Sequence, residues 1–214
     1  MIDLHVSTRA GALAALLSSV LLAVAPAPDT RLDSAELGKP APLFELKNLD
    51  GKTVNLSDSK GKLIVLEWLN PACPFCQYAY GPTGPLRTYP EAVRSRGVAW
   101  FTIVSENPGN PGGKPDAVRK FVEQNHVKTT VLLDTDGKVG KAYGAKSTPQ
   151  LFLISEKGAL VYRGALDNAP QGIVEKNDAR TNYIAAALAD LATGHAVLQS
   201  ETKPYGTSIG YLKR

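Results

Sequence analysis

The chain is poor in cysteine and histidine, the residues that most often hold transition metals. It has two cysteines and three histidines among 214 residues. His5, His126 and His195 show no metal-type pairing, and a structural zinc site needs four ligands. A c-type haem would need a histidine directly after Cys76, where Gln77 stands instead. We therefore expect no metal and no other cofactor.

Long runs of one charge sign are also absent. The 24 basic and 20 acidic residues leave a formal net charge of +4 and are scattered along the chain. No basic stripe is interleaved with aromatic side chains, as a nucleic-acid groove would require, so nucleic acid is excluded as an expected partner. With 43% hydrophobic residues the chain can bury one ordinary core, and its length favours a single domain.

The N-terminal region lacks an apolar run long enough to span a bilayer of about 30 Å comfortably. Its apolar stretch, residues 12–24, follows a single arginine, and small residues over 23–27 offer two possible cleavage sites. We predict a signal peptide over residues 1–27, with a retained anchor as the second interpretation and a buried helix as the third. Either of the first two places the rest of the chain outside the cytoplasm, periplasmic or secreted. Contact with a membrane is expected only if the segment is retained.

Strand and helix signals alternate through the rest of the chain. Residues 63–69 form a nearly continuous apolar run, typical of a central strand buried on both faces, and residues 98–104 form a second one. Between them a helix is expected to open at Cys73, with Pro74 at its first position. This is the pattern of a βαβ unit with parallel strands, so both strands end at the same sheet edge.

Shorter elements flank this unit. The pattern predicts a hairpin of strands at 42–46 and 53–56, a helix at 117–125, a strand or turn at 131–134, a short helix near Tyr143, a hairpin of strands at 151–154 and 160–163, and a last helix at 182–192. The loop 106–115 leaves the second central strand and is expected to overhang Cys73. We predict one domain over residues 38–193 and a C-terminal tail over 194–214 without a strong pattern.

The two cysteines stand as Cys73-Pro-Phe-Cys76, after a buried strand and at a helix start. There, unpaired backbone N–H groups and the helix dipole stabilise a thiolate, which makes Cys73 a nucleophile. Cys76, one helical turn further on, can attack a mixed disulfide formed at Cys73 and release the substrate. Phe75 between them is expected to be exposed and available to an apolar partner.

A purely structural role for the cysteine pair accounts for less of this pattern. A structural disulfide closing so small a ring stabilises by only about 2 kcal/mol in the loop-entropy model, so it would be a poor cross-link. Zinc and haem lack ligands, as described above. Two unrelated buried thiols would leave the placement at a helix start without a reason.

The residues at three places together resemble the thioredoxin superfamily, in its exported redoxin branch. These are Glu67-Trp68 on a strand, the Cys73–Cys76 motif at a helix start, and Thr148-Pro149 before a hairpin. The resemblance covers roughly residues 40–191. It implies an α/β, thioredoxin-like fold with a central mixed sheet flanked by helices, here with an N-terminal β-hairpin extension.

The same resemblance assigns roles to residues. It implies that Cys73 attacks, that Cys76 resolves, that Pro149 is cis and faces them, and that Thr148 pairs its backbone with a substrate peptide. Phe75 and Trp68 are further expected substrate-binding residues. It also gives Glu67 a role in proton transfer, which the residues support independently, because a carboxyl in a doubly buried strand should have a raised pKa. A salt-bridged structural glutamate is the alternative for Glu67.

The chain departs from the branch in one respect. Members often read Cys-Pro-Phe-Val at the motif and carry a cysteine in a C-terminal Tyr-Gly-Cys-Ser segment. Here Cys76 fills the first position, and Thr207 stands where the second cysteine would be. This difference suggests that the resolving thiol can stand at either of two positions and that this chain uses the one near Cys73.

These observations predict a thiol-disulfide oxidoreductase that reduces or exchanges disulfides of extracytoplasmic proteins. Its expected partners are protein or small-molecule thiols and disulfides, together with an unidentified redox partner. One alternative is a peroxiredoxin-like thiol peroxidase, but Leu66 and Asn70 occupy the places where such sites carry proline and threonine. Another is a noncatalytic binding module that docks partners on Phe75 and the loop 106–115. The buried acid and the redoxin-like layout favour a reductase or a general exchange role.

Overall fold

The computed structural model describes Met1, residues 33–175 and residues 178–213. Apart from Met1, the predicted signal segment 1–27 lies outside the described residues. Within them, no helix combines the length and the apolar content needed to cross a membrane.

Seven strands of the described residues form one mixed sheet in the order β2-β1-β5-β4-β3-β7-β8. The strands are β1 (Glu45–Asn48), β2 (Thr53–Asn55), β3 (Ile64–Trp68), β4 (Ala99–Val104), β5 (Thr130–Leu133), β7 (Gln150–Ile154) and β8 (Leu160–Gly164). The central strand β3 runs parallel to β4 and antiparallel to β7. All five residues of β3 are buried, as its apolar run predicts. The predicted βαβ unit and both hairpins are thus confirmed.

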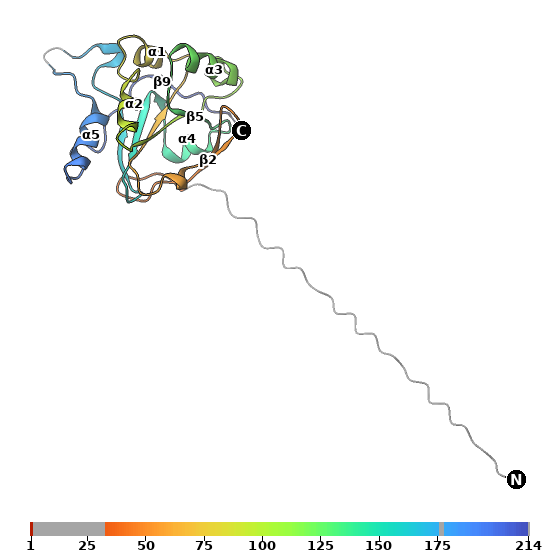
Figure 1. Cartoon of the computed structure of the whole chain (residues 1–214). Coiled ribbons are helices and arrows are strands. Elements are labelled where there is room, and N and C mark those ends of the chain that lie inside the picture. Colours follow the sequence, from red (N-terminus) through yellow and green to blue (C-terminus); the bar gives the residue numbers. More distant parts are fainter. Residues whose placement is uncertain (2–32, 176–177, 214) are drawn as a thin grey trace. The chain divides into compact units, whose positions relative to one another are not determined.

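Helices cover the two faces of the sheet unequally (Figure 1). The helices are α1 (Pro74–Tyr80), α2 (Tyr89–Arg94), α3 (Pro115–Gln124), α4 (Lys138–Tyr143) and α5 (Tyr183–Ala192). Buried side chains of α1, α2, α3 and α5 form one hydrophobic cluster with the sheet, whereas those of α4 and of the N-terminal hairpin region form the other. The two cysteines belong to the first cluster.

The C-terminal tail carries an element that the sequence pattern did not predict. Residues Thr207–Ser208 form a short strand, β9, which pairs antiparallel with β6 (Ser147–Thr148). A further anchor follows, because Ile209 N–H donates to the Lys146 carbonyl at 3.0 Å. The tail therefore packs along the segment that precedes Pro149.

Candidate functional site

Cys73 ends a tight turn that follows β3 and is organised by Asn70. The side-chain oxygen of Asn70 accepts a hydrogen bond from Ala72 N–H at 2.8 Å, and the backbone carbonyl of Asn70 accepts one from Cys73 N–H at 2.9 Å. Its amide in turn donates to Glu106 Oε2 at 3.0 Å. A Cβ at Gly112 would lie 1.9 Å from Asn70 Oδ1, so the loop after β4 is packed directly on this turn. This agrees with the expectation that the loop overhangs Cys73.

Cys73 caps the start of α1 and has no exposed surface. As a thiol it donates a hydrogen bond to the Thr148 carbonyl at 3.0 Å. A hydrogen bond from Cys76 is the largest influence on its ionisation and, together with weaker ones from Thr207 and Thr148, lowers the pKa of Cys73 to about 4 although burial acts in the opposite direction. A thiol with so low a pKa is a thiolate, and hence a nucleophile, at neutral pH.

Cys76 has the opposite ionisation behaviour, although it is also fully buried. Burial raises the pKa of Cys76 well above its ordinary value, and the hydrogen bond to Cys73 and the negative charges of Cys73 and Glu67 act in the same direction. Cys76 therefore stays protonated under conditions in which Cys73 is ionised. To become a nucleophile it needs a group that takes its proton.

Glu67 lies on β3 beneath the cysteines and has no exposed surface. Tyr80 OH lies 2.8 and 2.9 Å from its two oxygens, Trp100 Nε1 donates to Oε2 at 2.9 Å, and Thr102 Oγ1 lies 3.4 Å from Oε2. Burial raises the pKa of Glu67 to about 7, and these three donors limit the rise. The raised pKa of Glu67 is in the range suited to a general base near neutral pH, and its negative charge acts on Cys76. No salt bridge of Glu67 is found in the described part of the chain.

Thr148, which precedes Pro149, lies against Cys73. The peptide bond between Thr148 and Pro149 is cis, as the resemblance implies. Both residues are buried, and the Thr148 carbonyl contacts Cys73. The backbone edge of Thr148 is occupied by Thr207 of the tail.

Phe75, between the two cysteines, is less exposed than expected. Phe75 is half-buried rather than exposed, because the ring of Tyr205 lies against it with centroids 5.8 Å apart. Tyr205 is held there by a hydrogen bond from its hydroxyl to Asp167 at 2.6 Å. Phe75 therefore contacts the chain's own tail where a partner was expected.

Trp68 does not take part in the site, contrary to the sequence-based expectation. Successive side chains of a strand point to opposite faces, so Trp68 lies on the face away from Glu67. It is fully buried, packs against Tyr143 and Phe152, and donates from Nε1 to Ser105 Oγ at 3.0 Å. No surface of Trp68 is left for a substrate.

Sequence reasoning missed the residues that surround Glu67 and cover Cys73. Tyr80 and Trp100 come from α1 and β4, and Thr207 and Tyr205 come from the tail. One signal was available, because Tyr80 follows Cys76 by four residues and so shares its helix face. For Thr207 the resemblance gave a signal, because a resolving cysteine at this position would have to reach Cys73; the contact of Tyr205 with Phe75 had no comparable signal.

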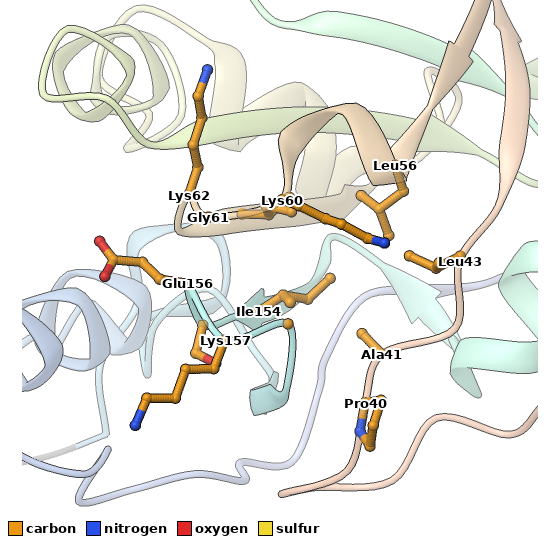
Figure 2. A pocket seen from close by; sticks show the side chains of 13 residues that line it. Pro40, Ala41, Leu43, Leu56, Lys60, Gly61, Lys62, Ile154, Glu156 and Lys157 are labelled. Atoms are coloured by element: carbon orange, nitrogen blue, oxygen red, sulfur yellow. The ribbon is translucent and has the colours of Figure 1, made fainter.

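The described residues contain no group of three or more histidine, cysteine or acidic side chains placed to hold a metal ion. A cavity of about 350 Å³ lies at the opposite end of β3 from Cys73 (Figure 2). Its lining includes Leu43, Ile64, Ile154, Lys60 and Lys157. In Figure 2 the side chain of Lys60 extends toward Leu43. It contains neither cysteine and is separate from the redox site.

Comparisons with known proteins agree with this geometry. The Redoxin family matches residues 36–182. A "Thiol-disulfide oxidoreductase ResA" of Bacillus thuringiensis subsp. konkukian is 30% identical over 132 residues, which is 62% of this chain and 71% of that protein. A "Thiol:disulfide interchange protein DsbE" of Yersinia pestis is 31% identical over 149 residues, which is 64% of this chain and 69% of that protein.

A solved structure extends the similarity beyond these regions. The crystal structure of an uncharacterized conserved protein from Geobacillus kaustophilus matches with a TM-score of 0.74 and 28% identity, covering 86% of this chain and 96% of that one. The match over residues 36–182 covers well over half of the chain. The chain therefore belongs to the Redoxin family, and it is a thiol-disulfide oxidoreductase with a thioredoxin-like fold.

Proposed function

We propose that Cys73 and Cys76 form the redox pair with which this protein reduces or exchanges disulfides of extracytoplasmic proteins. The observation that carries the proposal is the division of ionisation between two adjacent buried thiols. Cys73 has a pKa lowered to about 4, whereas the pKa of Cys76 is raised. Cys73 is thus ionised and able to attack, whereas Cys76 stays protonated and is influenced by the charge of Glu67.

The first step is attack by the Cys73 thiolate on one sulfur of a substrate disulfide. The Cys73 sulfur forms a new S–S bond, the substrate S–S bond breaks, and one substrate thiolate leaves and takes a proton from water. The hydrogen bonds from Cys76 and Thr207 stabilise the attacking thiolate beforehand. This step needs no proton acceptor at Cys73, because the thiolate is already formed.

The second step uses Cys76 and Glu67. Glu67 takes the proton of the Cys76 thiol, and the resulting thiolate attacks the Cys73 sulfur of the mixed disulfide. The mixed disulfide breaks, and the second substrate thiolate leaves. The substrate has gained two electrons, and Cys73 and Cys76 are joined as a disulfide. A partner dithiol must then supply two electrons to restore the pair.

The low pKa of Cys73 bears on the direction of electron flow. A stabilised thiolate favours the reduced form of the pair, which makes the disulfide easier to reduce and opposes a strongly reducing potential. We therefore favour exchange over dedicated reduction. The N-terminal segment supports an extracytoplasmic location, where stable disulfide substrates are found.

The test is the reduction potential of the pair, measured by thiol trapping in a glutathione redox series with Cys76→Ser as the control. We expect a reversible disulfide with a potential above the level of about −270 mV that marks a strong thiol reductant. A value near that level would assign the protein to dedicated reduction instead. A pair that forms no reversible disulfide would contradict the proposed function.

A further inference from the structure

The nucleophile of the site is closed off by the chain itself. Cys73 has no exposed surface, yet an incoming disulfide must reach its sulfur along the axis of the bond that breaks. Cys73 is enclosed by α1, by the β6 segment and by the tail. Because α1 and β6 belong to packed elements of the domain core, the tail is the element that can give way.

Residues 205–208 of the tail, here called the strap, lie across the site. Tyr205 packs on Phe75, and Thr207 pairs with Thr148 and contributes a hydrogen bond to Cys73. The strap is held at both ends. Before it, the side chain of Thr202 accepts a hydrogen bond from Ala165 N–H at 2.9 Å, and after it Gly210 N–H donates to Glu106 at 3.0 Å.

The strap occupies a backbone edge that an extended peptide would also use. Peptides commonly bind by adding a strand to an open sheet edge, where main-chain hydrogen bonds supply the affinity. The edge nearest to the Cys73 sulfur is that of β6, since the Thr148 carbonyl lies 3.0 Å from it. β9 fills this edge with an antiparallel pairing of only two residues. So short a pairing is a weak competitor by itself, and the anchors at both ends hold it in place.

We propose that the strap is a built-in gate that competes with substrate polypeptides for the edge of Thr148 and must lift before they reach Cys73. This inference rests on the proposed function. The outer side of the strap faces solvent, because Thr207 and Ser208 are exposed. Among the described residues, the strap is therefore the only layer between Cys73 and solvent on this side. A small disulfide can reach Cys73 after a smaller movement of the strap than a peptide, which must also pair with Thr148.

One glycine makes the gate testable with a single methyl group. A Cβ on Gly206 would lie 1.9 Å from the Thr148 carbonyl oxygen, and the φ of Gly206 is +117°. Gly206→Ala must therefore push the strap away from Thr148. Gly194→Ala is the matched control, because Gly194 also has a positive φ, +78°, but its Cβ would meet nothing within 4 Å. Tyr205→Ala loosens the strap through a different contact.

The experiment measures second-order rates of Cys73 with two substrates, a ten-residue peptide carrying a mixed disulfide and the small compound hydroxyethyl disulfide. If the open gate is a minor state of about 10%, Gly206→Ala should speed the peptide reaction by up to about tenfold and the small-disulfide reaction clearly less. Tyr205→Ala should act in the same direction, and Gly194→Ala should leave both rates unchanged. Circular dichroism and thermal unfolding check that each variant is folded.

The outcomes separate the gate from the proposed function. Equal peptide rates in the original chain, in Gly206→Ala and in Tyr205→Ala, with normal small-disulfide exchange, would overturn the gate and leave the exchange function intact. An equal acceleration of both substrates would overturn the competition for the Thr148 edge. Absence of exchange with either substrate in every folded variant would overturn the proposed function itself.

Discussion

The two faces of the central sheet each bury a tryptophan and a carboxyl, but the two carboxyls have different surroundings. On one face, Trp100 donates directly to Glu67 at 2.9 Å. On the other, Trp68 donates to Ser105, which donates to Asp134 at 2.5 Å. Both carboxyls are fully buried, and burial raises the pKa of each. Burial of an acid alone therefore does not identify a catalytic group.

The difference lies in what else each carboxyl contacts. Asp134 accepts hydrogen bonds from the backbone N–H groups of Val139 and Gly140, at 3.2 and 2.8 Å, where α4 begins. It thereby holds the helix start in place. The hydrogen-bond donors of Glu67 are side chains, and its charge acts on Cys76. A carboxyl whose charge acts on a thiol is placed to take part in thiol chemistry, whereas one that accepts hydrogen bonds from the start of a helix supports the fold.

The largest expected effect comes from removing Glu67, the proposed proton acceptor of Cys76. Glu67→Gln should slow release of the second substrate thiol about 100-fold at pH 7, because general-base help is typically worth that much or more. Attack by Cys73 should be unchanged. Single-turnover measurements with a chromogenic disulfide resolve the two steps.

Asp134→Asn is the matched control for Glu67→Gln, since it neutralises a buried carboxyl on the opposite face. It should leave both steps of the exchange at their original rates. Equal slowing in the two variants would mean that Glu67 acts on the reaction only through the stability of the sheet.

For stability, in contrast to exchange activity, we expect a large effect from changing Asp134. Asp134→Ala leaves Ser105 and two backbone N–H groups at the start of α4 without their acceptor. The free energy of unfolding should fall by about 3 kcal/mol, the scale typical of buried polar groups that lose a partner. Urea denaturation measures it. A loss below about 0.5 kcal/mol, the range of neutral surface changes, would show that Asp134 does not secure α4.

Much of this architecture was predictable, because its signals are local. The apolar run around β3, the Cys-x-x-Cys spacing and the helix-starting Pro74 predict the strand, the pair and α1. The placement of Trp68 away from the cysteines could have been foreseen, since neighbours on a strand point to opposite faces and Glu67 was expected to act on the cysteines. The cis bond at Pro149 could be inferred only from the resemblance, because nothing local to the sequence distinguishes it.

The resemblance pointed to Thr207 as a position near Cys73, but the strand pairing of the tail could not be predicted, for a physical reason. A two-residue strand of Thr207 and Ser208 has no apolar alternation, and its pairing partner, β6, lies some sixty residues earlier. Its position depends on contacts with Phe75 and Glu106 that exist only once the domain has folded. For the same reason, the expected exposure of Phe75 was wrong.

The pH dependence of stability should report the titration of Glu67. Glu67 has a pKa of about 7 in the folded chain against an ordinary value of 4.5, so the folded state keeps its proton to higher pH than the unfolded state does. The stabilisation is complete below pH 4.5 and is lost as the pH rises to 7, by up to about 3.5 kcal/mol at 1.4 kcal/mol per unit. The disulfide form is suitable, because Cys73 and Cys76 do not titrate in it. Glu67→Gln should remove this decline, and an unchanged pH profile would contradict the raised pKa.

The smallest expected effect is a shift in the pH dependence of thiol release when one of the two tryptophans is changed. Of the hydrogen bonds that hold the pKa of Glu67 down, the one from Trp100 has the largest effect, so Trp100→Phe should raise that pKa further. The pH at which release of the second thiol reaches half its maximum should then move upward. Trp68→Phe removes a similar volume from the other face and breaks only the bond to Ser105, so this midpoint should stay where it is. Equal shifts in both variants would mean that the sheet transmits changes from either face to Glu67, and the two carboxyls would then not be independent.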